Sequence, residues 1–187
     1  MNTSPHPYPL MSLKSRALRF LSHREYSRAE LAQKLKPFES SEGEIERLLN
    51  ELQAKDFLNE KRHAQSLINR RSEKLGLGRL KLEMRSKGVP DELALEALES
   101  VKATEVDRAH ALWQKKFGLL GLDPKAQAKQ TRFLISRGFS MDTVRIVFKR
   151  AAQAGLDTLD TLATLDSLEA HESQAAHATD AAKNNIL

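Results

Sequence analysis

The side chains of this chain whose types and spacing could do chemistry are mostly basic, and they lie in short clusters. The clusters occur in two stretches, 70–87 and 115–137. Lysine and arginine bind phosphate and carboxylate groups, so these clusters predict contact with a polyanion or with an acidic protein surface. The candidate contact residues are Arg70, Arg71, Lys74, Arg79, Lys81, Arg85, Lys87, Lys115, Lys116, Lys129, Arg132 and Arg137.

Catalytic, metal-binding and cofactor-binding patterns are missing from the sequence. The six histidines are scattered and form no HExxH pair, and there is no cysteine. Gly76-Leu77-Gly78 has neither the preceding strand nor the following Gly-Lys-Ser/Thr of a phosphate loop, so helix punctuation explains these glycines better. The carboxylates stand mostly at predicted helix starts, where capping explains them. We therefore expect a protein that is not an enzyme and that needs no metal or cofactor.

The net charge of +5 is distributed unevenly along the chain. Residues 12–153 hold 29 basic and 19 acidic side chains, a net charge of +10, whereas the segment from Ala154 onward carries −5. Such a basic region favours polyanionic partners. No apolar run reaches the roughly 20 residues that a membrane span needs, and the lack of cysteine fits a reducing compartment. We expect a cytoplasmic protein without membrane association.

Helical patterns run through the chain and must position the basic clusters. The predicted starts are Ser12, Ser27 with Glu30, Asn59, Pro90, Thr104 with Asp107, Asp123-Pro124 and Ser140. The helix after Asn59 is expected to reach Leu75. The short helix that follows carries apolar residues on one face and Lys81 and Arg85 beside them, and Gly88 ends it. Trp113 is predicted to be buried.

A repeat of 46 residues divides these helices into triplets. Arg16, Arg62 and Arg108 open the first helix of successive triplets at this constant spacing. The pattern predicts an all-α fold of three tandem three-helix repeats in an elongated, curved molecule. One irregular nine-helix globule is the alternative. The predicted segments are a disordered arm (1–11), repeats at 12–58, 59–102 and 103–154, and an acidic tail that is partly helical or disordered (155–187).

Four stretches, taken in order, resemble the RecX family of bacterial RecA regulators. They are ALRFLS and EYSRAEL (17–22 and 25–31), the segment 52–64 that ends in FLNEKRHA, LKLEMRSKGV (80–89), and KFG with RFLISRGFS (116–118 and 132–140). Together they span about residues 12–152. Four positions depart from the family pattern. Lys74 and Leu77 replace Gly and Pro of a Gly-x-Gly-Pro lead, His63 stands where an aromatic residue is common, and Asp56 replaces a small residue or Gly.

The resemblance implies a protein that binds the RecA filament on single-stranded DNA, and we expect it to be a monomer without enzymatic activity. It further implies inhibition of recombination, ATPase and coprotease activities, and so modulation of DNA repair and the SOS response. Direct binding to single- or double-stranded DNA is an additional expectation, because some family members bind DNA. Two other functions stay open: a helix-turn-helix-like DNA-binding protein acting in transcription, and an adaptor for an unrelated acidic partner.

Overall fold

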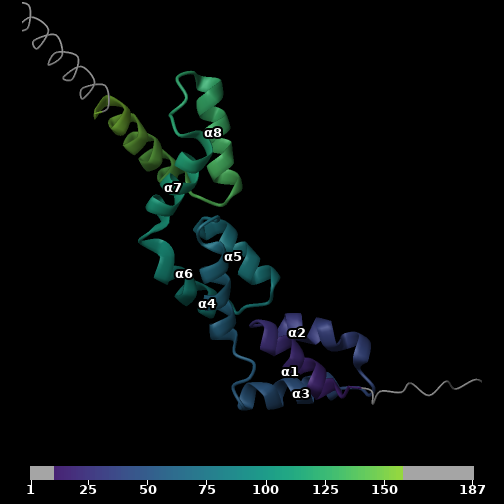
Figure 1. The fold of residues 1–187 in the computed structure, drawn as a ribbon. Helices are drawn as coiled ribbons and strands as arrows, with labels where there is room; N and C mark the ends of the chain where they lie inside the picture. Colours follow the sequence, from purple (N-terminus) through teal and green to yellow (C-terminus); the bar gives the residue numbers. More distant parts are fainter. Residues whose placement is uncertain (1–10, 158–187) are drawn as a thin grey trace, which may run out of the picture.

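The structure, a computed structural model, describes residues 11–157, and all regular elements in this range are helices (Figure 1). The predicted arm up to residue 10 and the predicted tail from residue 158 lie outside it. The first triplet contains α1 (Leu13–His23), α2 (Arg28–Leu35), the short 3-10 helix η1 (Lys36–Phe38) and α3 (Glu44–Ala54). The second contains α4 (Glu60–Arg71), α5 (Leu77–Ser86) and α6 (Asp91–Lys102). The third contains α7 (Glu105–Phe117), α8 (Pro124–Ser136) and a helix over 141–157, where the described range ends.

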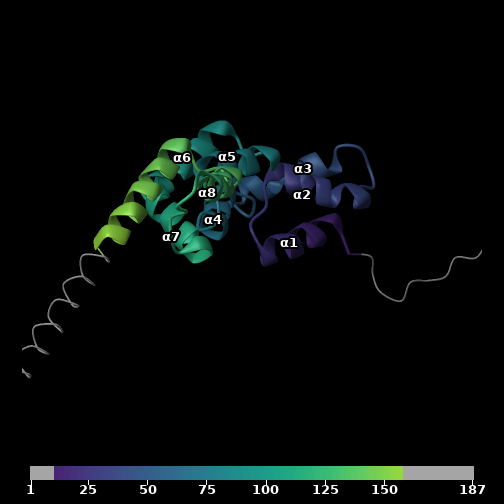
Figure 2. The same ribbon diagram turned by 90° about the horizontal axis from the view of Figure 1, so that it is seen from above.

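Each triplet buries an apolar cluster of its own, so we call the triplets repeats 1, 2 and 3. Leu31, Leu49 and Leu52 belong to the first cluster, and Trp113 with Leu134 belongs to the third. The second cluster is made by α4, α5 and α6. The repeats follow one another in an elongated, curved row with repeat 2 in the middle (Figures 1 and 2). The predicted all-α repeat architecture is confirmed, and three separate clusters disagree with a single globule.

Side-chain caps fix most helix starts where the sequence predicts them. Ser27 and Glu30 form a complete capping box at α2, which satisfies two backbone N–H groups that the helix itself cannot. Similar caps hold the other starts: Ser12 accepts from Ser15 N–H, Asn59 from Arg62 N–H, Asp123 from Ala126 N–H and Ser140 from Thr143 N–H.

Two local predictions are wrong. Thr104 precedes α7, but its hydroxyl donates to the Val101 carbonyl and caps nothing. The reason is its backbone, which is not extended as a capping residue requires, since α6 passes into α7 through a tight turn. The second error concerns α4, which ends at Arg71 and does not reach Leu75. The N–H groups of Lys74 and Leu75 both donate to the Arg71 carbonyl and close the helix there.

Each following repeat caps the middle helix of the repeat before it. Glu60, in the first turn of α4, accepts the Arg28 N–H at the start of α2 at 2.6 Å. Glu105, in the first turn of α7, accepts the Leu77 N–H at the start of α5 at 2.9 Å. Carboxylates are favourable at helix N-termini, where N–H groups lack partners and the dipole is positive. The two junctions between repeats are therefore built in the same way.

The arginines of the 46-residue repeat also hold these junctions. Arg62 donates to Glu25 of repeat 1 at 2.9 Å. Arg108 donates to the backbone carbonyls of Ser72 and Leu75 in repeat 2, the latter at 2.9 Å. Arg16 contacts its own repeat, where it lies 4.1 Å from the centroid of the Phe38 ring. The repeat spacing thus marks the residues that join neighbouring units.

At each junction, the C-terminal end of one repeat's middle helix contacts the N-terminal end of the middle helix in the preceding repeat. Ser27 Oγ donates to the Lys87 carbonyl at the first junction, and Gly76 N–H donates to the Arg137 carbonyl at 2.9 Å at the second. At the second junction the backbones touch, since Gly78 N–H also donates to the Gly138 carbonyl at 3.1 Å. These contacts set the positions of α5 and α8, which carry five of the candidate cations: Arg79, Lys81, Arg85, Lys129 and Arg132.

Candidate functional site

The side chains of the described range offer little to a metal or a membrane. No group of three His, Cys, Asp or Glu residues among them could hold a metal ion. None of the helices in residues 11–157 is both long and apolar enough to cross a bilayer. The chemical feature that is concentrated in residues 11–157 is the positive charge of clustered lysine and arginine side chains.

One hollow of about 320 Å³ lies where repeat 1 meets repeat 2. Its polar lining comes from α4, α5 and the residues that follow α1 and α5. Four cations face it: Arg24, Arg70, Arg71 and Lys87. Glu83 is the one acidic residue in this lining, so the hollow has an excess of positive charge.

A second hollow, of about 310 Å³, continues from the first along α5. The two share Arg71 and Glu83, and the second adds Arg79, Leu82 and Ser86. Leu82 is 58% exposed, so it lies away from the buried face of α5. We call the five cations of the two hollows the basic track: Arg24, Arg70, Arg71, Arg79 and Lys87.

Glu30 neutralises two cations of the basic track and fixes the first junction. Its carboxylate accepts from Arg24 at 3.2 and 3.3 Å and from Lys87 at 2.6 Å. Burial would raise the pKa of Glu30, but these charged hydrogen bonds outweigh it and lower the pKa from 4.5 to about 2. Buried His63 lies 3.6 Å from this carboxylate, and burial lowers its pKa below 6.5. The hydrogen bonds to Glu30 therefore fix the positions of the Arg24 and Lys87 side chains.

The first junction should weaken in acid. A carboxylate whose pKa is lower in the folded state contributes stability above its unfolded value, here 4.5, and loses it as the pH falls toward about 2. The lowered pKa of His63 acts in the same direction below 6.5. We expect Glu30→Gln to lower the free energy of unfolding above pH 4.5, and this difference from the wild type to vanish near pH 2 in chemical denaturation.

Glu51 provides the matched control for Glu30. The pKa of Glu51 is also lowered to about 2, by hydrogen bonds from Lys14 and Lys55, but this cluster lies at the surface and both lysines are exposed. Exposed ion pairs contribute little to stability. Glu51→Gln should therefore change stability much less than Glu30→Gln. Equal effects of the two substitutions would contradict a structural role for the Glu30 cluster.

Arg70 and Arg79 are the cations of the basic track that have no carboxylate partner among the described residues. Arg70 donates to the Ser66 carbonyl, one turn back in α4. Arg71 differs, because it pairs with Glu83 at 3.1 Å. Arg70 and Arg79 are both exposed. A ligand can therefore pair with Arg70 and Arg79 without displacing a carboxylate of the described residues.

Three other candidates around α5 lie away from these hollows. Lys81 lines a more apolar hollow of about 280 Å³ between α5 and α6, with Leu95 and Leu98. Arg85 pairs with Asp91 at 3.1 Å. Lys74 lies in the turn between α4 and α5. The short basic helix thus presents its cations on more than one side.

Repeat 3 carries the remaining five candidates. Arg137 and Lys116 lie over the ring of Phe133, 3.8 and 5.9 Å from its centroid. The Arg137–Gly138 backbone contacts the start of α5, so Arg137 and Arg79 belong to one junction. The other three are exposed and have no ion pair within the described range: Lys115, Lys129 and Arg132.

Comparison with known proteins adds to this geometry. Family models described as the first and third three-helix domains of RecX match residues 14–52 and 103–148. A regulatory protein RecX from Leptothrix cholodnii is 47% identical over 143 residues, which cover 76% of this chain and 91% of that protein. The chain belongs to the RecX family. A second RecX, from Herminiimonas arsenicoxydans, is 40% identical over 74% of this chain and 92% of that one.

Solved RecX structures share the fold. The crystal structure of RecX from Lactobacillus salivarius superimposes with a TM-score of 0.65 at 24% identity, covering 75% of this chain and 95% of that one. Another RecX crystal structure gives a TM-score of 0.64 at 20% identity. The row of three-helix repeats is thus shared with proteins whose sequences have diverged widely.

Two departures from the RecX pattern lie at junctions. Leu77 stands at a proline position of that pattern, and here its N–H donates to Glu105, which proline cannot do. His63 stands at an aromatic position and is fully buried against the Glu30 cluster. Both substitutions add polar groups to the contacts between repeats.

Arg24 is the cation of the basic track that sequence reasoning missed. It follows α1 as an isolated basic residue, so no cluster marks it. The sequence holds one weak signal for Arg24, which is Tyr26 two residues later, because an arginine can stack on a nearby aromatic ring. In the structure the Arg24 guanidinium lies over the Tyr26 ring, 3.6 Å from its centroid. Arg24 belongs to repeat 1, so it extends the basic track into that repeat.

Proposed function

We propose that this RecX-family protein binds the RecA nucleoprotein filament on single-stranded DNA and inhibits its recombination, ATPase and coprotease activities. In this role it modulates DNA repair and the SOS response in the cytoplasm, as a monomer and without enzymatic activity of its own. Family membership supports a regulatory protein. The observation that supports the rest is the basic track, which crosses the first junction and in which Arg70 and Arg79 have no acidic partner within residues 11–157.

An elongated, curved row of repeats suits a helical filament. The basic track covers repeats 1 and 2, and Arg137 and Lys116 add positive charge on repeat 3. Contacts spread along such a row can span neighbouring filament subunits and the DNA between them. Each phosphate neutralised by a cation releases counterions, so the complex should weaken steeply as salt rises.

Charge reversal on the basic track tests this proposal. The double variant Arg70→Glu/Arg79→Glu should bind the filament about 10- to 100-fold more weakly, because two ionic contacts become repulsive. If both contacts are to phosphates, the slope of log affinity against log salt should fall by about two. Binding is measured by fluorescence anisotropy of RecA filaments on labelled single strands, at several salt concentrations.

The control is Lys81→Glu/Arg85→Glu, which makes the same charge change on α5 outside the basic track. Helicity and melting temperature should stay unchanged in both variants, because all four side chains are exposed. If only the control variant bound more weakly, the filament contact would lie on the α5–α6 side and not on the basic track. Tight binding to one duplex sequence in the absence of RecA would instead favour the helix-turn-helix-like regulator.

A further inference from the structure

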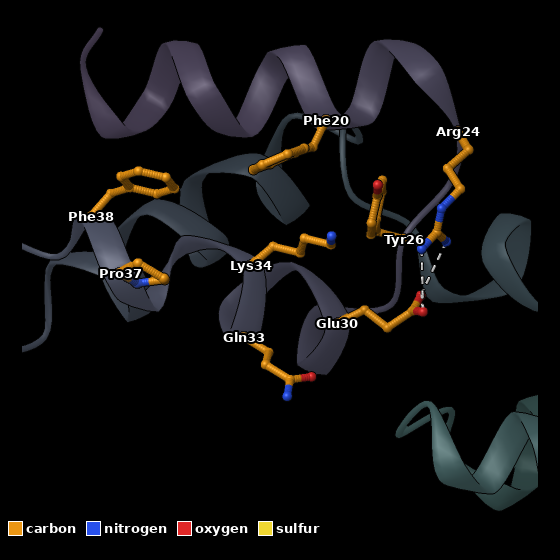
Figure 3. Close-up of a pocket in the computed structure, with 8 residues that line it drawn as sticks. All are labelled: Phe20, Arg24, Tyr26, Glu30, Gln33, Lys34, Pro37 and Phe38. Atoms are coloured by element: carbon orange, nitrogen blue, oxygen red, sulfur yellow. Dashed lines mark hydrogen bonds and ion pairs between the residues drawn. The ribbon is translucent and has the colours of Figure 1, made fainter. Parts of the chain in front are cut away.

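Repeat 1 contains a cleft whose chemistry differs from that of the basic track. The cleft holds about 580 Å³, within the roughly 300–1,000 Å³ of small-molecule sites. It opens between the C-terminal half of α1 and the face formed by α2 and η1 (Figure 3). Most of its lining is apolar, and three aromatic rings supply much of that surface: Phe20, Tyr26 and Phe38.

Cations surround these rings. Lys34 reaches into the cleft from α2, 6.0 Å from the ring centroid of Phe20 (Figure 3). Lys34 is exposed and has no carboxylate partner among the described residues. Arg24 lies over Tyr26, and Arg16 lies over the Phe38 ring at 4.1 Å. Glu30 is the one carboxylate of the lining and is already paired with Arg24 and Lys87. The cleft therefore suits a flat apolar group that carries a negative charge on the side of Lys34.

The cleft and the basic track meet at one residue, Arg24. Arg24 lines both the cleft and the hollow between repeats 1 and 2. A polyanionic strand whose phosphates follow Arg70 and Arg71 therefore arrives at the mouth of the aromatic cleft. This shared residue favours a nucleic acid over an isolated small molecule.

We propose that the repeat 1 cleft binds an unstacked base of single-stranded DNA whose backbone follows the basic track. The exposed ring of Phe38 provides the stacking surface at the rim, and Lys34 pairs with the adjoining phosphate. Every base has a π face, so such a site accepts any sequence. A duplex hides the faces of its bases, so the site selects single strands. The inference deepens the proposed function and uses the same basic track.

Phe38→Ala is the direct test, because this ring is 40% exposed and belongs to no core cluster. We expect the full chain carrying this change to bind a labelled oligothymidylate about 5- to 150-fold more weakly, the loss of one stacked base. The salt dependence should not change, because no charge is removed. Phe57→Ala is the matched control, since Phe57 is 51% exposed and does not line the cleft, and it should leave the affinity unchanged.

An abasic oligonucleotide of the same length separates stacking from phosphate binding. Phe38→Ala should not alter affinity for it, or for the corresponding duplex. Lys34→Gln is a second variant that leaves the apolar lining intact, and it should weaken binding and lower the salt slope by about one. Unchanged oligothymidylate binding by Phe38→Ala, with unchanged melting, would overturn the inference. Weaker binding to RecA filaments with unchanged binding to bare strands would also overturn it and would make the cleft a protein contact.

These results separate the inference from the proposed function. If the wild-type chain inhibits RecA but Phe38→Ala binds bare strands normally, the inference fails and the function stands. If Phe38 is needed for binding bare strands but the wild type has no effect on RecA, the function fails and the base site stands.

Discussion

Replacing Trp113 by alanine should destabilise repeat 3 by about 3–5 kcal/mol, the range for deleting a buried large aromatic residue. Trp113 is 2% exposed and fills the centre of the third apolar cluster. Its Nε1–H donates to Gln130 Oε1 at 3.2 Å, and Gln130 Nε2 donates to the Leu119 carbonyl at 2.9 Å. The substitution therefore leaves a cavity and also loosens the connection between α7 and α8. Chemical denaturation followed by circular dichroism measures the loss.

Gln114 provides the control for this prediction. It is the next residue of α7, it is exposed, and alanine suits a helix at least as well. Gln114→Ala should change stability by no more than about 0.5 kcal/mol. If Trp113→Ala unfolded at the same denaturant concentration as Gln114→Ala, Trp113 could not be the centre of the third cluster.

Gly138→Ala should destabilise the second junction by roughly 2–5 kcal/mol. Gly138 has a φ of +86°, and a left-handed backbone costs an alanine about 1–2 kcal/mol. Its Cβ would also stand 2.8 Å from Arg79 Cα and closer still to the Arg79 nitrogen. Relieving this overlap means separating α8 from α5, at about 1–3 kcal/mol for overpacking. Because Trp113 is the single tryptophan, its fluorescence reports on repeat 3 alone.

Gly43→Ala is the control that separates the cost of the left-handed backbone from the cost of steric overlap. Its φ is +74°, but a Cβ there would meet nothing within 4 Å. Gly43→Ala should therefore show only the cost of the left-handed backbone. The tryptophan transition of Gly138→Ala should also separate from the circular dichroism transition, since repeat 3 loses its support from repeat 2. Equal stability losses in the two variants would contradict a tight second junction.

Local sequence signals predicted much of the fold because the interactions behind them are local. Ser27 and Glu30 are three residues apart, and their capping box forms within one turn. The 46-residue spacing of the repeat arginines also predicted three units, because Arg62 and Arg108 each join a repeat to the one before it. The glycines near residue 77 fit helix punctuation in the sequence. Their role in the contact with Gly138 could not be predicted, since that contact brings together distant parts of the chain.

The basic surface was predicted in composition but not in arrangement. Lys87 is a candidate contact in the sequence, and its partner Glu30 could not be predicted because it lies 57 residues away. Arg79 and Lys81 differ by two positions, which in a helix places them on nearly opposite sides. A count of basic residues cannot separate them, whereas the packing of α5 against α6 does.

The most direct test of the proposed function is RecA's ATP hydrolysis on single-stranded DNA, titrated with this protein well below the RecA concentration. A filament-level inhibitor should reduce the rate at substoichiometric amounts, and Arg70→Glu/Arg79→Glu should need about 10- to 100-fold more protein for the same effect. An unchanged rate with one molecule of wild-type protein per RecA would contradict regulation of the filament through the basic track.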